Sequence, residues 1–404
     1  MFNELKKLFS SRFMWVILAI AVGFSLYNML SSVMRNYESD AATTESIKEY
    51  SAQIDAEGLS GDELCDVLYE SQQKLEKQYY AGDSSIFEQY AAAEKAYKYA
   101  TYVYKTFPAN RMKIVENMEY DLRYSKGGNS RMLETAVRLY NRNVPLSFTF
   151  TGHSHERTYE FFNNKFSEIA MLALIAAMSV RIFSVDRSTG AYRLIDTTRK
   201  SQRTVFRRQL SAVCVVALFL AAVLAAMEVI LSVSVYGLSG FMLPVQQLEM
   251  YEMCPFSLTI AGFYLVKFIS KLMVYFMVVA FSAFCAVFFK RTVVSDVVSV
   301  IFSAGGQLVC VFYLYATTRG GTAVFPSTVF MTQEGTEQYD TIRALVPQGL
   351  LNISKYMEKF DYMLLFGIPI NRMFFCLGIT VLLTVIFTVA AYCVRTRNVR
   401  GAWR

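Results

Sequence analysis

The chain has few charged residues for its length. They make up 18% of its 404 residues, whereas hydrophobic residues make up 54%. A soluble globular domain carries about 25% charged residues, because its surface has to be solvated. The low share of charge therefore excludes an ordinary soluble protein and indicates that much of the chain faces lipid.

The chain also lacks a nucleotide-binding loop and has only two histidines. The glycine pair Gly127-Gly128 has neither the spacing nor the following Gly-Lys-Ser/Thr with which such loops hold phosphates. His153, His155 and Glu156 are close in sequence, but two histidines in an exposed turn are more often solvated than bound to a metal. No combination of His, Cys, Ser and Asp suggests catalysis. We expect no metal, no bound cofactor and no enzymatic activity in this chain.

The seven cysteines do not form the pattern of a disulfide framework. Five of them fall in apolar segments, where Cys behaves as a small apolar residue. Only Cys65 and Cys254 lie outside those segments, and no spacing rule indicates whether they are bridged.

Long apolar runs are abundant. A bilayer core of roughly 30 Å requires about 20 apolar residues per helix, and six segments meet this requirement: Phe13–Met34, Ile169–Val185, Leu210–Gly237, Gly262–Phe289, Val293–Ala316 and Met373–Val394. The second is short and contains Arg181, whose long side chain can reach the interface. The first continues beyond Ala19-Ile20-Ala21, which mimics a signal-peptide cleavage site, so we expect an uncleaved anchor.

The loops differ in charge. The N-terminal segment, residues 181–209, Lys290-Arg291 and the tail after residue 394 are basic, whereas Glu249 and Glu252 lie on the other side. Lys and Arg favour the cytoplasmic side, so both termini are expected inside. The net charge of +7 then reflects topology and not nucleic-acid binding, because the basic residues are spread along membrane edges.

The predicted fold is an all-α polytopic membrane protein with six transmembrane helices, both termini in the cytoplasm, and a mainly helical extracytoplasmic domain between the first two spans. Residues 1–34 contain an amphipathic helix, with Phe2, Leu5 and Phe9 on one face, and the first span. Residues 35–165 form the outer domain, and residues 166–404 form the membrane domain with spans two to six.

The outer domain carries several helix signals. Ser60 and Glu63 form a capping box that opens a helix. Apolar and aromatic residues then recur at spacings of four and three, which is typical of a packed helical hairpin, and we expect Pro108 to end this run. The residues of this seam are Ile86, Tyr90, Ala93, Tyr97, Ala100, Tyr104 and Phe107. Shorter helices flank Gly127-Gly128, and a short strand is expected at Leu146–Phe150. The outer segment 317–372 is expected to form short helices and turns broken by its prolines.

The loop 181–209, between the second and third spans, carries the largest positive excess of any connection. An acidic residue follows the apolar segment, and a glycine lies four residues after it. A basic stretch then begins the helix of the next span. The residues of this element are Asp186, Arg187, Gly190, Arg193, Leu194, Thr198, Arg199, Lys200, Ser201 and Arg203.

This pattern resembles the cytoplasmic coupling element of ABC-2 type exporter permeases. Asp186 stands where that family usually has Glu, and Arg199 stands where it often has Pro. The segments PFSLTIAGFYLVKFISKLMVY and FDYMLLFGIPINRMFF and the tail VRTRNVR are also similar to the family, in the same order. The resemblance covers most of the membrane portion but not Arg35–Lys165.

The resemblance implies a permease subunit of an ATP-driven exporter in the plasma membrane, of bacterial origin. Its implied partners are cytoplasmic ABC ATPase subunits, which would bind ATP and Mg, a second permease subunit in a homo- or heterodimer, and membrane lipid. A topology-setting basic loop without a partner is the alternative interpretation of residues 181–209.

Three polar residues fall inside the spans. Glu228 is expected near the outer leaflet boundary, either as a functional carboxylate or in reach of water. Lys267 and Lys271 share one helical face near the same interface. They can pair with Glu228, but we expect them to snorkel to the interface.

Two other classes of function remain open. A membrane-anchored sensor or immunity protein would bind an extracellular ligand through the outer domain, and a membrane-embedded enzyme would need catalytic pairs within the spans. The substrate of a transporter cannot be deduced from these residues.

Overall fold

The computed structural model describes residues 2–9, 12, 14–31, 61–142, 144, 146, 165–188, 199–236, 241–248, 251–289, 291–319 and 340–401. Within these ranges, six helices are long and apolar enough to cross a membrane: Met14–Ser31, Ser167–Val185, Gln202–Leu231, Ile260–Phe288, Thr292–Cys310 and Arg372–Thr396. Each coincides with one of the six segments predicted from hydropathy. The chain is therefore a helical, multi-pass membrane protein.

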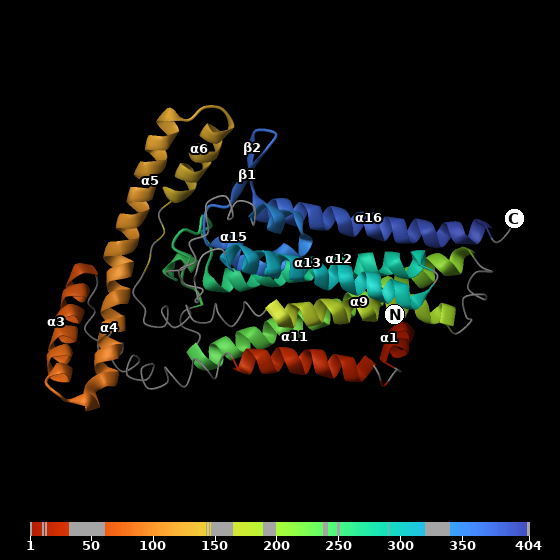
Figure 1. Cartoon of the computed structure of the whole chain (residues 1–404), viewed down its shortest axis with the longest axis horizontal. Coiled ribbons are helices and arrows are strands. Elements are labelled where there is room, and N and C mark those ends of the chain that lie inside the picture. Colours follow the sequence, from red (N-terminus) through yellow and green to blue (C-terminus); the bar gives the residue numbers. More distant parts are fainter. Residues whose placement is uncertain are drawn as a thin grey trace.

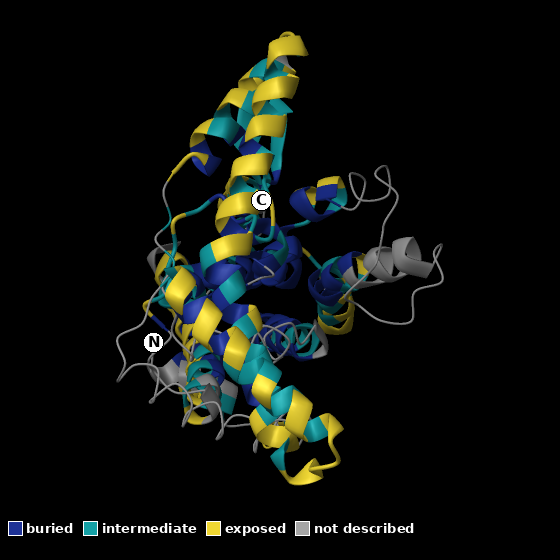
Figure 2. Ribbon diagram, turned by 90° about the vertical axis from the view of Figure 1, so that its left-hand side faces the viewer, coloured by how far each residue is buried: buried dark blue, intermediate teal, exposed yellow. Residues whose placement is uncertain are grey.

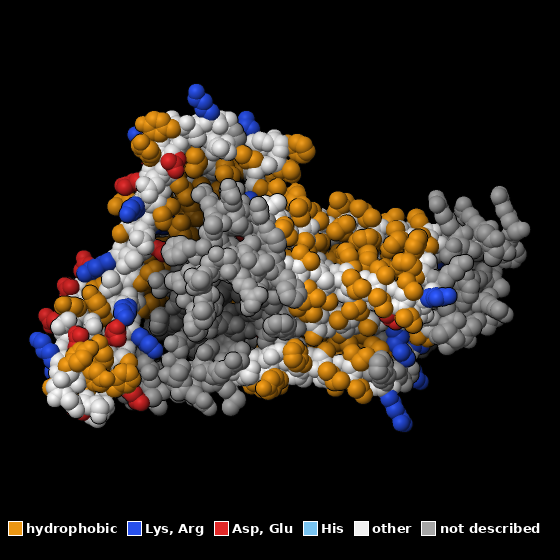
Figure 3. Space-filling model, viewed as in Figure 1, with side chains coloured by type: hydrophobic (Ala, Val, Ile, Leu, Met, Phe, Trp, Pro, Cys, Tyr) orange, Lys and Arg blue, Asp and Glu red, His pale blue; other side chains and the backbone are white. Residues whose placement is uncertain are grey.

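The spans form one elongated bundle (Figure 1). After the helix at residues 14–31, its members are α9 (Lys165–Ser188), α11 (Arg199–Tyr236), α12 (Ile260–Phe288), α13 (Thr292–Arg319) and α16 (Arg372–Gly401). Helix α12 contacts α9, α11, α13 and α16, so it is the centre of the core. On the face shown in Figure 3, hydrophobic side chains cover most of the bundle, whereas most charged side chains lie beyond it.

The two ends of the bundle differ. Both ends of the chain lie at one end, which we call the terminal end, and the helices inserted between the first two spans lie at the other, the insert end (Figure 1). At the terminal end, α1 (Phe2–Phe9) forms the predicted N-terminal helix and contacts α9 and α11.

The inserted helices are α3 (Gly61–Tyr80), α4 (Phe87–Thr101), α5 (Phe107–Tyr124) and α6 (Gly128–Tyr140), with the single turn η1 (Ser84–Ile86) between α3 and α4. They form two hairpins whose outer faces are exposed (Figure 2). The predicted seam packs as expected, because none of its residues is exposed. Tyr97 contacts Tyr69 of α3 at a ring distance of 5.3 Å, and Tyr90 stacks on Tyr79 at 5.7 Å.

Pro108 does not end the helical run, and that prediction is wrong. Helix α4 continues into α5 through the π-helical turn η2 (Tyr102–Thr106). Pro108 then occupies the first turn of α5, where proline is tolerated because its missing N–H is not needed. The wider turn absorbs the change in hydrogen bonding that a proline imposes within a straight helix.

The inserted helices contact the bundle through hydrogen bonds from tyrosines and an asparagine. The hydroxyl of Tyr102 donates to the carbonyl oxygen of Gln246 at 2.8 Å, near the turn η3 (Val245–Gln247). The hydroxyl of Tyr140 donates to the carbonyl oxygen of Met253 at 2.7 Å. Asn110 donates to Glu252 at 2.9 Å. The two hairpins are therefore docked on the insert end of the bundle.

The segment before α16 contains the turn η5 (Pro347–Asn352), the short helix α15 (Ile353–Met357) and a β-hairpin, β1 (Tyr362–Leu365) and β2 (Ile368–Asn371). The turn η5 is buried against α12, α13 and α16, and the amide nitrogen of Gln348 donates to the carbonyl of Phe302 at 3.0 Å.

The hairpin corrects the prediction of helices and turns alone. Leu365 pairs with Ile368 across a two-residue loop, Phe366-Gly367, and both loop residues have positive φ, 50° and 77°. Such loops match the right-handed twist of paired strands. Phenylalanine is an unusual residue at this position, so the turn signal is weak in the sequence. The strand expected at Leu146–Phe150 falls mainly on residues that the structure does not describe.

The free thiols Cys65 and Cys254 belong to different parts of the molecule. Cys65 lies between α3 and α4, and Cys254 lies in the main core of the bundle.

Candidate functional site

The spans contain a buried network of four charges at the insert end of the bundle, which we call the four-charge network. It consists of Glu168 of α9, Glu228 of α11, and Lys267 and Lys271 of α12. The ammonium of Lys271 lies 2.7 Å from Glu168 and 3.2 Å from Glu228, and the ammonium of Lys267 lies 3.3 Å from the other oxygen of Glu228. The two carboxylates and two ammonium groups balance in charge.

The helical phase explains why these charges face inward. On α11, Ala217, Ala221, Leu224 and Glu228 share one buried face. On α12, Lys267 and Lys271 occupy the same face as the fully buried Val274 and Val278. Residues at spacings of three and four lie on one side of a helix, so packing of these faces turns the charged residues toward each other.

The lysines do not snorkel, so that prediction is wrong and pairing with Glu228 is the outcome. Only 7% of the Lys267 side chain and 3% of the Lys271 side chain are exposed. The Glu228 side chain is 5% exposed, so the alternative that places it in reach of water is not the one that the structure shows. Desolvating a charge costs several kcal/mol, and an oppositely charged partner at hydrogen-bonding distance offsets this cost. Pairing is therefore the more stable arrangement at this depth.

Two further members of the site were not predicted. Glu168 lies one residue before the predicted start of the second span, so it does not stand out as a charge within an apolar run. The hydroxyl of Tyr275 donates to Glu168 at 3.1 Å. Lys267, Lys271 and Tyr275 recur at every fourth residue of α12, and this spacing is the signal that could have identified Tyr275.

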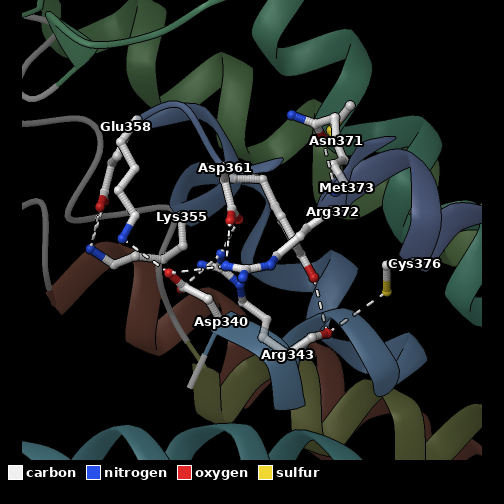
Figure 4. Close-up of polar contacts among 11 residues, drawn as sticks. Asp340, Arg343, Lys355, Glu358, Asp361, Asn371, Arg372, Met373 and Cys376 are labelled. Carbon is white, nitrogen blue, oxygen red and sulfur yellow. Dashed lines mark hydrogen bonds and ion pairs between the residues drawn. The ribbon is translucent and has the colours of Figure 1, made fainter. Parts of the chain in front are cut away.

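A second charged cluster lies in the segment before α16, and we call it the arginine cluster (Figure 4). The buried guanidinium of Arg343 lies 3.1 Å from Asp340 and 2.6 Å from Asp361, and its carbon lies 4.0 Å from the ring centre of Tyr356. Arg372, the first residue of α16, lies 2.9 Å from Asp361 and 3.6 Å from Asp340. Lys359 completes the cluster at 3.0 Å from Asp340.

The arginine cluster holds this segment on the start of α16. Burial raises the pKa of Asp361, and the neighbouring Asp340 adds to that shift, whereas Arg343, Arg372 and Lys359 oppose it. Burial also raises the pKa of Tyr356, whose hydroxyl donates to the carbonyl of Arg343 at 3.0 Å. The cluster is thus a structural connection that keeps the segment closed over the bundle.

The structure describes only the flanks of the predicted coupling element, and these lie at the terminal end. Asp186 and Arg187 belong to the last turn of α9, and Arg199, Lys200 and Ser201 to the first turn of α11, with no description of their side chains. Gly190, Arg193, Leu194 and Thr198 lie outside the described residues. Arg203 is exposed, and its guanidinium carbon lies 5.9 Å from the ring centre of Tyr392 in α16.

Aromatic residues join these flanks to α16. Phe206 of α11 lies 5.5 Å from Phe183 of α9 and 5.9 Å from Tyr392 of α16, measured between ring centres. Gln209 of α11 donates to the carbonyl of Ile182 at 3.1 Å and accepts from Arg395 at 2.6 Å. Helices α9, α11 and α16 therefore meet at the terminal end of the bundle.

The remaining site hypotheses concern metals. His153, His155 and Glu156 lie outside the described residues, and among the residues that are described no group of three or more His, Cys, Asp or Glu side chains could hold a metal ion.

Comparison with models of known protein families, with curated proteins and with solved structures finds no match to this chain.

Proposed function

We propose that this chain is the membrane subunit of an ATP-driven exporter of the ABC-2 permease kind. Residues 181–209 dock a separate cytoplasmic ATPase, which binds ATP and Mg, and a second permease subunit completes the substrate path in a bacterial plasma membrane. The observation that carries this proposal is the basic loop whose two flanking helices, α9 and α11, each contribute a carboxylate to the four-charge network.

The two helices are suited to transmit force along the bundle. Fifteen residues separate Phe183 from Glu168 on α9, and nineteen separate Gln209 from Glu228 on α11. At a rise of 1.5 Å per residue these distances are about 22 and 28 Å. A displacement of the loop by an ATPase would reach the network through two continuous helices.

The network offers a way to change the pairing between helices, because Lys271 lies between two carboxylates. Lys271 is shared between Glu168 of α9 and Glu228 of α11, and Lys267 also pairs with Glu228. If α9 shifts against α11, Lys271 can move toward Glu168 while Lys267 stays paired with Glu228, or toward Glu228 while Glu168 keeps the hydroxyl of Tyr275. Two discrete arrangements of a packed interface are the usual basis of such transitions.

The test is co-purification with, and stimulation of, the cytoplasmic ATPase encoded nearest to this chain. Gly190→Pro changes the backbone of the loop, and Arg199→Glu reverses a charge that would face the ATPase. We expect each variant to reduce ATPase stimulation by about tenfold or more. Lys126→Glu, an exposed charge reversal between α5 and α6, is the matched control and should leave stimulation unchanged.

Equal complex yield and ATPase stimulation in all three variants would contradict the coupling role. Thiol labelling of intact cells tests the orientation of the chain in the membrane. With cysteine at position 126 or 200, an impermeant thiol reagent on intact cells should label only position 126, because the insert end is proposed to be outside. Labelling at position 200 would overturn the orientation.

A further inference from the structure

The inserted helices contain a hollow of about 530 Å³ between α5 and the end of α6. Its floor is apolar and buried, because Val103, Phe107, Val115 and Tyr140 are each at most 9% exposed. Pro108 and Met112 line the exposed rim. Pockets for small organic ligands fall in this range of volume and combine an apolar lining with a few polar groups.

Three charged residues line the hollow: Arg111, Glu116 and Arg142. Their sum is one positive charge. Arg111 donates to the carbonyl oxygens of Tyr140 at 2.7 Å and of Arg142 at 3.2 Å. Its guanidinium carbon lies 5.6 Å from the ring centres of both Phe107 and Tyr140. These contacts fix the position of the cation between two aromatic rings.

The charge of Arg111 is not balanced by a carboxylate in the part of the chain that the structure describes. No ion pair joins Arg111 to a described Asp or Glu, and its Nη1 atom is buried without a hydrogen-bond partner. Burial lowers the pKa of this guanidinium, which means that its charged form is incompletely solvated. A half-buried cation beside an apolar hollow is electrostatically complementary to an anion with an apolar body.

The hollow is close to the junction with the bundle. Its lining residue Tyr140 donates to the carbonyl of Met253, and Asn110, next to Arg111, donates to Glu252. A ligand in the hollow would therefore lie next to the contacts by which the inserted helices dock on the spans.

We propose that this hollow binds a free alkyl carboxylate from the aqueous phase. The alkyl chain lies on Val103, Phe107 and Val115, and the carboxylate lies near Arg111 and Arg142. This site goes beyond the proposed export function, since it lies in the inserted helices, which the family resemblance does not cover. It does not depend on an ATPase partner.

The experiment is photo-crosslinking of the full chain in phosphatidylcholine nanodiscs with decanoate that carries a diazirine on its alkyl chain. Mass spectrometry of the digested protein should place the crosslinks on residues 103–116. Unlabelled decanoate should compete, whereas decanol, which has the same chain without the charge, should compete at least about fivefold less well. Equal competition by decanol would overturn the assignment to an anion.

Two exposed positions test the site without disturbing the contacts of Arg111. Met112→Glu adds a negative charge at the rim and should reduce crosslinking at least about fivefold, whereas Glu116→Gln removes one and should increase it. Met112 is 64% exposed, so the protein tolerates a polar side chain there. Asn117→Glu, an exposed position of α5 outside the lining, is the matched control. Equal crosslinking in Met112→Glu and Asn117→Glu would overturn the proposal.

A last experiment distinguishes a free carboxylate from an anionic lipid as the ligand of the hollow. Nanodiscs that contain phosphatidylglycerol should give the same crosslinking as phosphatidylcholine alone. If phosphatidylglycerol abolished the crosslinks, the hollow would be a lipid site, and the proposal of a free alkyl carboxylate would be wrong.

Discussion

The two charged clusters of this protein are built from similar groups but differ in how many partners each carboxylate has. In the four-charge network, Glu168 has one described cation, Lys271, together with the hydroxyl of Tyr275. In the arginine cluster, Asp340 has three cations within 4 Å and Asp361 has two. Glu168 therefore depends on Lys271, whereas Glu228 and both carboxylates of the arginine cluster keep a cation when one of theirs is lost.

The clusters also differ in access to water at their edges, although Arg343 and Asp361 at the centre of the arginine cluster are each 1% exposed. The Lys271 side chain is 3% exposed, whereas the Lys359 side chain at the edge of the arginine cluster is 47% exposed. A charge that loses its partner at an apolar helix interface has no solvent to replace it. The comparison teaches that ion pairs at similar distances can differ several-fold in the free energy of unfolding that is lost when one partner is removed. The loss depends on whether a second cation remains and on whether water can replace the missing partner.

The largest effect is expected for Lys271→Met, which leaves Glu168 without a cation. We expect this substitution to lower the free energy of unfolding by about 3–5 kcal/mol, because an uncompensated charge remains buried. Chemical denaturation in detergent micelles measures it. Lys105→Met is the control, since Lys105 pairs with exposed Asp62 and Asp66 at 3.6 and 4.0 Å and should cost less than about 1 kcal/mol.

A second substitution sharpens this test. In the Lys271→Met background, Glu168→Gln removes the isolated charge and should restore part of the lost stability. Equal losses in Lys271→Met and Lys105→Met would show that the four-charge network contributes nothing beyond a surface pair.

A smaller effect is expected for Arg343→Met in the arginine cluster. Both carboxylates keep Arg372, and Asp340 also keeps Lys359, so neither is left without a cation. The loss of charged hydrogen bonds should cost about 1.5–3 kcal/mol. A loss as large as that of Lys271→Met, measured in the same denaturant series, would contradict the role of redundancy.

The smallest effect is a change in pH dependence. Burial already raises the pKa of Asp361, and Arg343 opposes that shift, so Arg343→Met should raise the pKa further. A carboxyl whose pKa is higher in the folded state than in the unfolded state takes up its proton preferentially when folded, and stability then increases as the pH falls.

The stability gap between Arg343→Met and the unsubstituted protein should therefore narrow as the pH is lowered from the folded-state pKa of Asp361 in the variant to its lower folded-state pKa in the unsubstituted protein. Below that pH the gap should stay constant, because the unfolded-state pKa is the same for both chains. Unfolding midpoints measured along a pH series test this expectation. Adding Asp361→Asn to Arg343→Met should remove the narrowing, and a narrowing that persisted would assign it to another group.

The sequence predicts the six spans because their signal is local and repeated. About 20 apolar residues in succession leave a helix as the only way to satisfy the backbone in lipid, wherever the other spans lie. The seam of Ile86–Phe107 is predicted for the same reason, since a spacing of three and four residues is a property of one helix.

The charge network could be predicted only in part. Glu228, Lys267 and Lys271 stand out as charges in apolar runs, but whether they pair depends on how α11 is rotated against α12. Both helices are apolar on several faces, so their sequences do not select one rotation. Glu168 lies 60 residues from Glu228 and has no local feature that points to it. The continuation of the helix past Pro108 and the hairpin at Phe366-Gly367 likewise depend on contacts with parts of the chain that are distant in sequence.

The sequence by itself determined the number of spans, the approximate position of each span and the uneven distribution of charge, because hydropathy, periodicity and charge are read from neighbours along the chain. Only the tertiary structure decided that Lys267 and Lys271 pair with Glu228 and do not reach the interface, that Glu168 and Tyr275 join them, and that Arg111 lies beside an apolar hollow. Each of these outcomes requires helices distant in sequence to come within hydrogen-bonding reach, and their relative rotation follows from the packing of whole faces and from no single segment.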